Sequence, residues 1–195
     1  MSWMTRLAVG VLLMLLPAVG FAGDGVVALQ SADPSCPDST NAIYVNCGNG
    51  TITDNRTGLV WLANANCLGT MNWYSALKFV AGLSDLPGAD VSDCGLSDES
   101  SPGEWRLPSA DEWEVMVAFA NALDCDPAIT NDQGDDCWGS GVSSFSDVKT
   151  GFYWSSTTDP AATTTAWSAL LLGGDVGGGI PKTATPYVWP VRGGQ

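Results

Sequence analysis

The sequence predicts an α+β domain, because short strand-like segments stand before and after two amphipathic helices in a chain of 195 residues. Val, Ile, Thr and aromatic residues cluster in 42–45, 51–53 and 59–62, which is typical of strands. Apolar residues recur at helical spacing in 70–82 and 109–123. The composition includes 23 glycines and only 14% charged residues, which favours a folded, loop-rich domain over a disordered acidic tail.

The first 22 residues predict a secretory signal peptide. Arg6 precedes an apolar run from Leu7 to Leu16, and Gly20-Phe21-Ala22 offers small residues to a signal peptidase. The run is shorter than the roughly 20 residues that span a membrane. We therefore expect cleavage near Ala22, an N-terminal arm over 23–41 and one domain over 42–195, located in the periplasm, at the cell surface or in the medium.

The six cysteines predict disulfide bonds, since an even number in an exported chain is typical of them. Six cysteines allow 15 pairings. We expect the sequential pairing, because the first and last pairs each bracket one short, turn-rich segment. The expected bonds are Cys36–Cys47, Cys67–Cys94 and Cys125–Cys137.

The first three strands and the first helix follow from local patterns. Segments rich in Asn, Asp and Gly separate the strands, so the sequence predicts an antiparallel meander. We expect Thr70 to cap the helix over 70–82, with Trp73, Leu77, Val80 and Ala81 along its buried face.

The second helix has the clearer start signal. Ser109 and Glu112 form a capping box, in which each side chain bonds to the backbone of the other residue. Long loops are expected over 84–103 and 125–150. Further strands are expected over 153–154, 166–172 and 187–191, with Gly173 to Gly179 as a flexible hairpin tip.

The charge and composition exclude several functions. The net charge is −14, or −15 once Arg6 leaves with the signal peptide, which opposes binding to nucleic acids and to anionic lipid surfaces. The chain contains no histidine, which excludes Ser-His-Asp and Cys-His catalysis and histidine-based zinc sites. Disulfides can occupy every cysteine, and no motif singles out a carboxylate pair for glycoside cleavage. We therefore expect a protein that is not an enzyme.

Four sequence patches together carry a resemblance to a known family. They are GTITDNRTGLVW at 50–61, WRLPS at 105–109 with Glu112, YWSST at 153–157 and YVWPVRGG at 187–194. In this order they resemble the Lcl C-terminal domain family, which takes its name from a Legionella collagen-like adhesin. The resemblance covers the chain from about residue 42 onward and implies a bacterial surface protein.

The resemblance implies a fold and a class of function. The family is related to the C-type-lectin-like and formylglycine-generating-enzyme folds, which implies two helices flanking a small, irregular antiparallel sheet with long disulfide-tied loops. The namesake domain binds sulfated glycosaminoglycans and supports adhesion, although an acidic chain opposes a polyanionic ligand. The resemblance thus implies a secreted or surface-exposed recognition domain that binds a glycan or a surface protein.

Two alternatives remain. The chain could be a structural subunit of a filament or pilus-associated assembly, in which the N-terminal arm docks as a strand onto a partner or a second copy. It could also be an oxidase or hydrolase, although the related copper enzymes need a reactive cysteine pair.

Candidate ligand contacts are few among the arginines and tryptophans. We expect Arg106 to pair with Glu112 or Asp111 rather than bind an anion, and Arg56 and Arg192 to be structural likewise. Most tryptophans are expected in the core, including Trp167. Trp138 differs, because it lies in a polar loop, and it is a candidate for ligand contact.

An acidic segment in the second long loop predicts a calcium site. Calcium needs six to eight oxygen ligands on a flexible loop, although the spacing here is not that of an EF-hand. We expect a bound ion to order the loop, with Asn131 and Trp138 beside the ligand surface. A solvated acidic loop pinned by Cys125 and Cys137 is the alternative. The candidate metal ligands are Asp124, Asp126, Asp132, Asp135 and Asp136.

Overall fold

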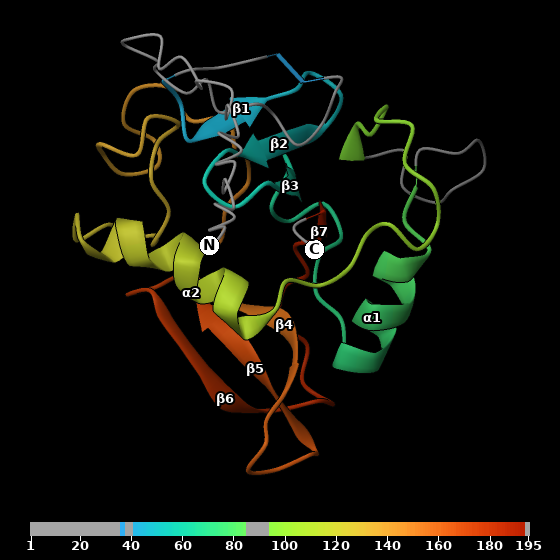
Figure 1. Ribbon diagram of the computed structural model, residues 1–195. Helices are drawn as coiled ribbons and strands as arrows, with labels where there is room; N and C mark the ends of the chain where they lie inside the picture. Colours follow the sequence, from blue (N-terminus) through green and yellow to red (C-terminus); the bar gives the residue numbers. More distant parts are fainter. Residues whose placement is uncertain (1–35, 38–40, 85–93, 194–195) are drawn as a thin grey trace, which may run out of the picture.

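The computed structural model describes residues 36–37, 41–84 and 94–193 and shows an α+β architecture with two antiparallel sheets and two helices (Figure 1). The expected signal peptide and most of the expected N-terminal arm lie outside the described residues, as does part of the loop over 84–103. The elements are β1 (Tyr44–Asn46), β2 (Thr51–Asp54), β3 (Leu59–Leu62), α1 (Trp73–Ala81), α2 (Ala110–Asn121), β4 (Phe152–Thr158), β5 (Thr165–Leu170), β6 (Asp175–Pro181) and β7 (Val191–Gly193).

The first sheet has the strand order β1-β2-β3-β7 and is antiparallel throughout. Its first three strands are the predicted meander. The strand expected over 187–191 lies later in the chain, because the residues that pair with β3 are Val191–Gly193. Val191 pairs with Trp61 and Gly193 with Leu59, so β7 completes the sheet from the far end of the sequence.

The second sheet has the order β4-β5-β6, so the expectation of a single small sheet is wrong. The expected hairpin tip over 173–179 is confirmed at its start, since residues 171–174 turn between β5 and β6, but it is shorter than expected. Gly173 and Gly174, with φ of 81° and 70°, already turn the chain in the left-handed region that glycine tolerates. The later glycines then lie inside β6, beside β5.

The helices begin at side-chain caps. Asn72, not Thr70, caps α1, and its side chain accepts a hydrogen bond from the Ser75 N–H at 3.0 Å. The buried face of α1 is Trp73, Ala76 and Val80, whereas Ala81 is exposed. In α2 the predicted capping box between Ser109 and Glu112 is confirmed.

An aromatic cluster joins the two sheets. The ring centroid of Trp61 in β3 lies 5.2 Å from that of Trp113 in α2 and 5.2 Å from that of Trp189. Trp189 also contacts Tyr153 of β4, with ring centroids 5.6 Å apart. These four side chains are at most 1% exposed, so the core lies between the sheets with α2 crossing it (Figure 1).

Three disulfides tie the loops to this core. The bonds are Cys36–Cys47, Cys67–Cys94 and Cys125–Cys137, the pairs that the sequence predicts. All six cysteines lie within the described residues and all are bonded. The bonded cysteines are 11, 27 and 12 residues apart. In the chain-entropy model, closing a loop of roughly such a length adds about 3 kcal/mol to the free energy of unfolding.

Candidate functional site

Asn131 organises the acidic loop from inside. Its side-chain oxygen accepts hydrogen bonds from the backbone N–H of Gly134 at 2.8 Å and of Asp135 at 3.2 Å, and its amide nitrogen donates to the Asp135 carboxylate at 2.8 Å. Asn131 is only 4% exposed. The structure thus gives it a local structural role, and its contact with a ligand stays a prediction.

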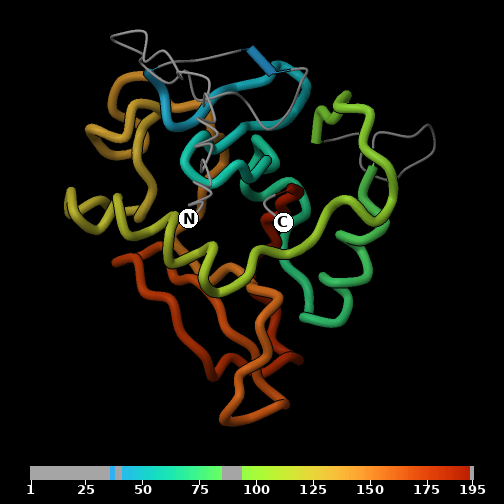
Figure 2. Tube along the Cα trace, in the orientation of Figure 1, coloured from blue at the N-terminus to red at the C-terminus, as the bar shows by residue number. Residues whose placement is uncertain are grey.

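Asp132 links the loop to the first sheet. Its carboxylate accepts hydrogen bonds from the backbone N–H and the hydroxyl of Ser144, at 2.8 and 2.6 Å. Its carbonyl oxygen accepts from the N–H groups of Ile43 and Tyr44 at 2.7 and 3.1 Å. The loop over 124–150 therefore lies beside the segment that enters β1, as Figure 2 shows.

Asp124 and Asp126 lie beside the turn between β5 and β6. Both are exposed and line an open hollow of about 380 Å³ with Asn121, Cys125 and residues 172–173. Asp136 is also exposed, and its carboxylate accepts a hydrogen bond from the Cys137 N–H at 2.8 Å. Among the described residues, no group of three or more acidic, cysteine or histidine side chains could hold a metal ion. The structure thus unites two of the five predicted metal ligands, and calcium binding stays a prediction.

Trp138 is partly buried against the core rather than free in the loop. Its indole N–H donates to the Phe145 carbonyl oxygen at 2.9 Å, and its backbone N–H donates to Ile129 at 2.9 Å. These contacts fix the ring at the edge of the Cys125–Cys137 loop. Part of its surface remains open to solvent, which leaves room for the predicted ligand contact.

The expectation that Trp167 belongs to the core is wrong. Trp167 is partly exposed in the centre of β5, and it stands apart from the core cluster, which Trp138 joins. The apolar sequence around it, TAWSALL, resembles a buried strand and hid this position. The signal that could have revealed it is the run Gly177 to Gly179, since glycines offer no side chains to cover a neighbouring ring.

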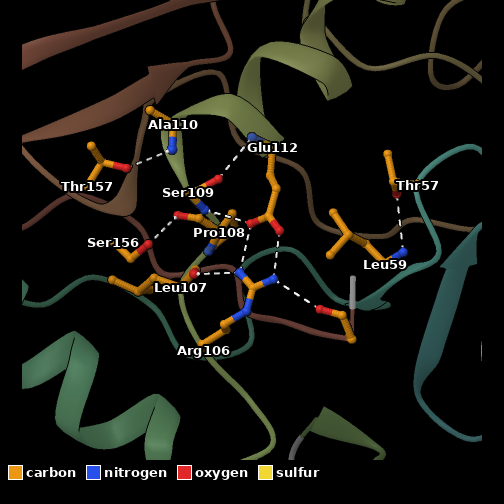
Figure 3. A network of polar contacts seen from close by, with 11 residues as sticks. Thr57, Leu59, Arg106, Leu107, Pro108, Ser109, Ala110, Glu112, Ser156 and Thr157 are labelled. Carbon is orange, nitrogen blue, oxygen red and sulfur yellow. Dashed lines mark hydrogen bonds and ion pairs between the residues drawn. The ribbon is translucent and has the colours of Figure 1, made fainter. Parts of the chain in front are cut away.

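Arg106 joins the start of α2 to β7 (Figure 3). Its guanidinium forms two hydrogen bonds with Glu112, at 2.7 and 2.6 Å, and donates to the Gly193 carbonyl oxygen at 3.0 Å. Burial raises the pKa of Glu112, but the hydrogen bonds from Arg106 and Ser109 outweigh it and leave this pKa below its ordinary value. The predicted pairing with Glu112 is confirmed, so Arg106 is a structural residue.

β4 meets the same helix start. The Ser156 N–H donates to the Pro108 carbonyl oxygen at 2.7 Å. The Ser156 hydroxyl donates to the same oxygen at 3.3 Å, and the Thr157 hydroxyl accepts from the Ala110 N–H at 3.0 Å (Figure 3). Three of the four sequence patches therefore converge on the beginning of α2, where they build framework.

The other two framework arginines are paired as expected. Arg56 bonds to the Asp54 carboxylate at 2.9 and 2.8 Å and to the Tyr44 hydroxyl at 2.7 Å. Burial raises the pKa of Tyr44 above its ordinary value, although the Arg56 charge opposes the shift. Arg192 pairs with the buried Asp98 carboxylate at 3.1 Å.

No helix among the described residues is long and apolar enough to cross a membrane. A search of curated proteins finds no match. The sequence model of the family described as Lcl C-terminal domain matches residues 50–192, about three quarters of the chain, and this segment holds the first three patches and most of the fourth. The chain therefore belongs to the Lcl C-terminal domain family.

Proposed function

We propose that this chain is an exported, surface-exposed recognition domain of the adhesin type, which binds a glycan or a surface protein and catalyses no reaction. Membership of the Lcl C-terminal domain family carries the proposal, because that family suggests an adhesin-like extracellular domain. The three disulfides support an oxidising compartment, and the signal peptide proposed for residues 1–22 would provide the route to it.

The chain combines a packed core with long loops, and this arrangement supports a ligand-binding function. The family patches build a rigid core, whereas the segments over 94–103 and 124–150 are irregular and disulfide-tied. Binding residues concentrate on such loops, because a rigid scaffold holds them in place. We place the ligand surface near the Cys125–Cys137 loop, with Trp138, Asn131 and a calcium ion as its proposed components.

The chemistry of the chain favours binding over catalysis. The sequence has no histidine, and each cysteine is consumed in a disulfide, so neither can act as a base or a nucleophile. The net charge of −14 also opposes a sulfated or nucleic-acid ligand. Two helices, antiparallel sheets and tied loops support the proposed relation to C-type-lectin-like folds.

The alternative, a structural subunit, has one specific observation in its favour. Besides its buried face, α2 presents a second apolar stripe. Val115 and Phe119 are 40% and 49% exposed, Leu123 just beyond the end of α2 is 40% exposed, and residues 115–123 carry no charge. The Arg56 guanidinium lies over the Phe119 ring, 4.5 Å from its centroid. Two copies of a chain with a net charge of −14 repel each other wherever charged surfaces meet. The uncharged, apolar stripe avoids this repulsion, so it is the contact that we propose between copies.

Two measurements test these functions. A glycan array probed with the purified mature chain, together with binding to whole cells, should give saturable binding if the chain is a recognition domain. Sedimentation velocity of wild type and Phe119→Glu tests the alternative, which requires wild-type oligomers that the substitution dissociates. Binding in neither assay and a monomer at all concentrations would contradict both functions.

A further inference from the structure

Trp167 stands where both neighbouring strands bulge. In the register between β4 and β5, residues 155–157 fall opposite Trp167 alone. In the register between β5 and β6, Gly178 and Gly179 fall opposite it. Bulges redirect side chains and often lie next to binding sites, so the chain departs from regular pairing on both sides of one tryptophan.

Two polar groups meet above the backbone of Gly178. A Cβ atom added at Gly178 would lie 2.7 Å from an oxygen of the Asp159 carboxylate and 3.2 Å from the indole nitrogen of Trp167. A side chain at this position would therefore displace the Asp159 carboxylate, the closer of the two groups.

The polar edge of the Trp167 indole is covered. The nitrogen is buried and has no acceptor among the described residues, which is unusual for a native donor. Since its one polar side-chain atom is buried, any part of the Trp167 side chain that reaches solvent is carbon. The sheet therefore presents an apolar ring whose single donor is covered.

Asp159 retains acceptor capacity beside this ring. One oxygen accepts the Ala161 N–H at 2.9 Å and the other accepts the Thr165 hydroxyl at 3.0 Å. A carboxylate offers about four acceptor positions, so each oxygen has one left. Asp159 is partly exposed, which makes those positions available to hydroxyl groups of a ligand.

From this geometry we propose that Trp167 and Asp159 form a binding site for a neutral pyranose sugar. The apolar C–H face of the sugar stacks on the indole ring. A sugar hydroxyl can donate to the Asp159 carboxylate at the edge of the ring. This inference rests on the proposed recognition function and adds a second ligand surface, on β5, to the one proposed near the Cys125–Cys137 loop.

The charge of the site selects among sugars. The Asp159 carboxylate, in a chain of net charge −14, repels sulfated sugars and uronic acids. The site therefore favours galactose, glucose or N-acetylglucosamine units over the polyanionic chains that the family resemblance alone would suggest.

Isothermal titration of the mature protein with neutral oligosaccharides of these three sugars, with heparin as the sulfated comparison, tests the site. Trp167→Ala should weaken binding at least about tenfold, since it removes the stacking surface. Trp167→Phe should recover part of the loss. Tyr74→Ala, which removes an aromatic ring that is 61% exposed on α1, is the matched control and should bind as wild type does. Thermal melts should show each variant folded.

The possible results separate the two proposals. Loss of binding in folded Trp167→Ala and Asp159→Asn, with Tyr74→Ala unaffected, supports the site. If neutral sugars bind wild type and Trp167→Ala equally while Trp138→Ala abolishes binding, the recognition function stands and this site is wrong. Preference for heparin in both wild type and Trp167→Ala also overturns it. If no glycan and no cell surface binds, the recognition function itself fails.

Discussion

Arg106 and Glu112 face each other as a two-pronged ion pair, with the two guanidinium nitrogens 2.7 and 2.6 Å from the two carboxylate oxygens. The same carboxylate accepts the Ser109 N–H at 2.7 Å, so one side chain closes the capping box and fixes the arginine that reaches β7. Charge-assisted bonds of this geometry are stronger than neutral ones.

Glu112→Gln should destabilise the fold by about 2 kcal/mol at neutral pH, because it removes a charge-assisted pair and weakens a helix cap. The folded-state pKa of Glu112 is lowered. Its contribution is therefore complete above the ordinary pKa of glutamate and is lost as the pH falls through the lowered value. Urea unfolding should show the difference between wild type and variant shrinking below about pH 4. The exposed Glu114→Gln is the control, and equal behaviour of the two variants would contradict the prediction.

Peptide mapping without reduction should recover the three sequential disulfides. Replacing Cys125 and Cys137 together by alanine should lower the free energy of unfolding by roughly 3 kcal/mol, since the unfolded chain regains the freedom of the closed loop. Thiol titration of wild type should detect no free cysteine. A linkage such as Cys67–Cys125 would contradict the fold described above.

The buried tryptophans should dominate stability. Trp154→Ala and Trp189→Ala should each cost about 3–5 kcal/mol, because both side chains are fully buried and leave large cavities. Trp138→Ala should cost less, since its ring is partly exposed and its loop is held by a disulfide. Thermal melts give the ranking, and a larger loss for Trp138 than for the other two would show that the core is misplaced.

Calcium, if it binds the acidic loop, should raise the melting temperature by mass action. The weak oxygen sites of extracellular proteins have dissociation constants of about 10⁻⁴–10⁻³ M, so millimolar calcium should suffice. Asp124→Asn with Asp126→Asn should abolish the shift, whereas Glu114→Gln should not. Equal midpoints with calcium and with chelator, and no heat on titration, would leave a solvated acidic loop.

Elements whose cause is local could be predicted from sequence. Ser109 and Glu112 specify the start of α2, because both partners of the capping box lie within one turn. The choice between Thr70 and Asn72 at α1 could not be made in this way, since both residues can cap. The position of the first helical residue depends on Trp73, whose indole N–H donates to the Ser155 carbonyl oxygen at 2.8 Å, far along the chain.

The candidate site depended more on distant partners. Asp132 looks like a free acidic ligand in the sequence, but Ser144 and the segment entering β1 surround it. Trp167 looks like a core residue, and its surface position follows from bulges in two other strands. The residues next to Asp132 and Trp167 in the sequence do not reveal these distant partners. Composition and periodicity therefore misplaced Trp167 and left the role of Asp132 undecided.

The pairing of β7 with β3 has a consequence for biogenesis. Leu59 pairs with Gly193, and Trp61 packs on Trp189. Both contacts can form only after the ribosome has made nearly all of the described domain. A chain that lacks residues 187–193 leaves Trp61 and Trp113 without the ring of Trp189, so we expect it to be less stable than the complete domain. Late closure of the first sheet would be compatible with the proposed export, in which the chain crosses a membrane before it folds.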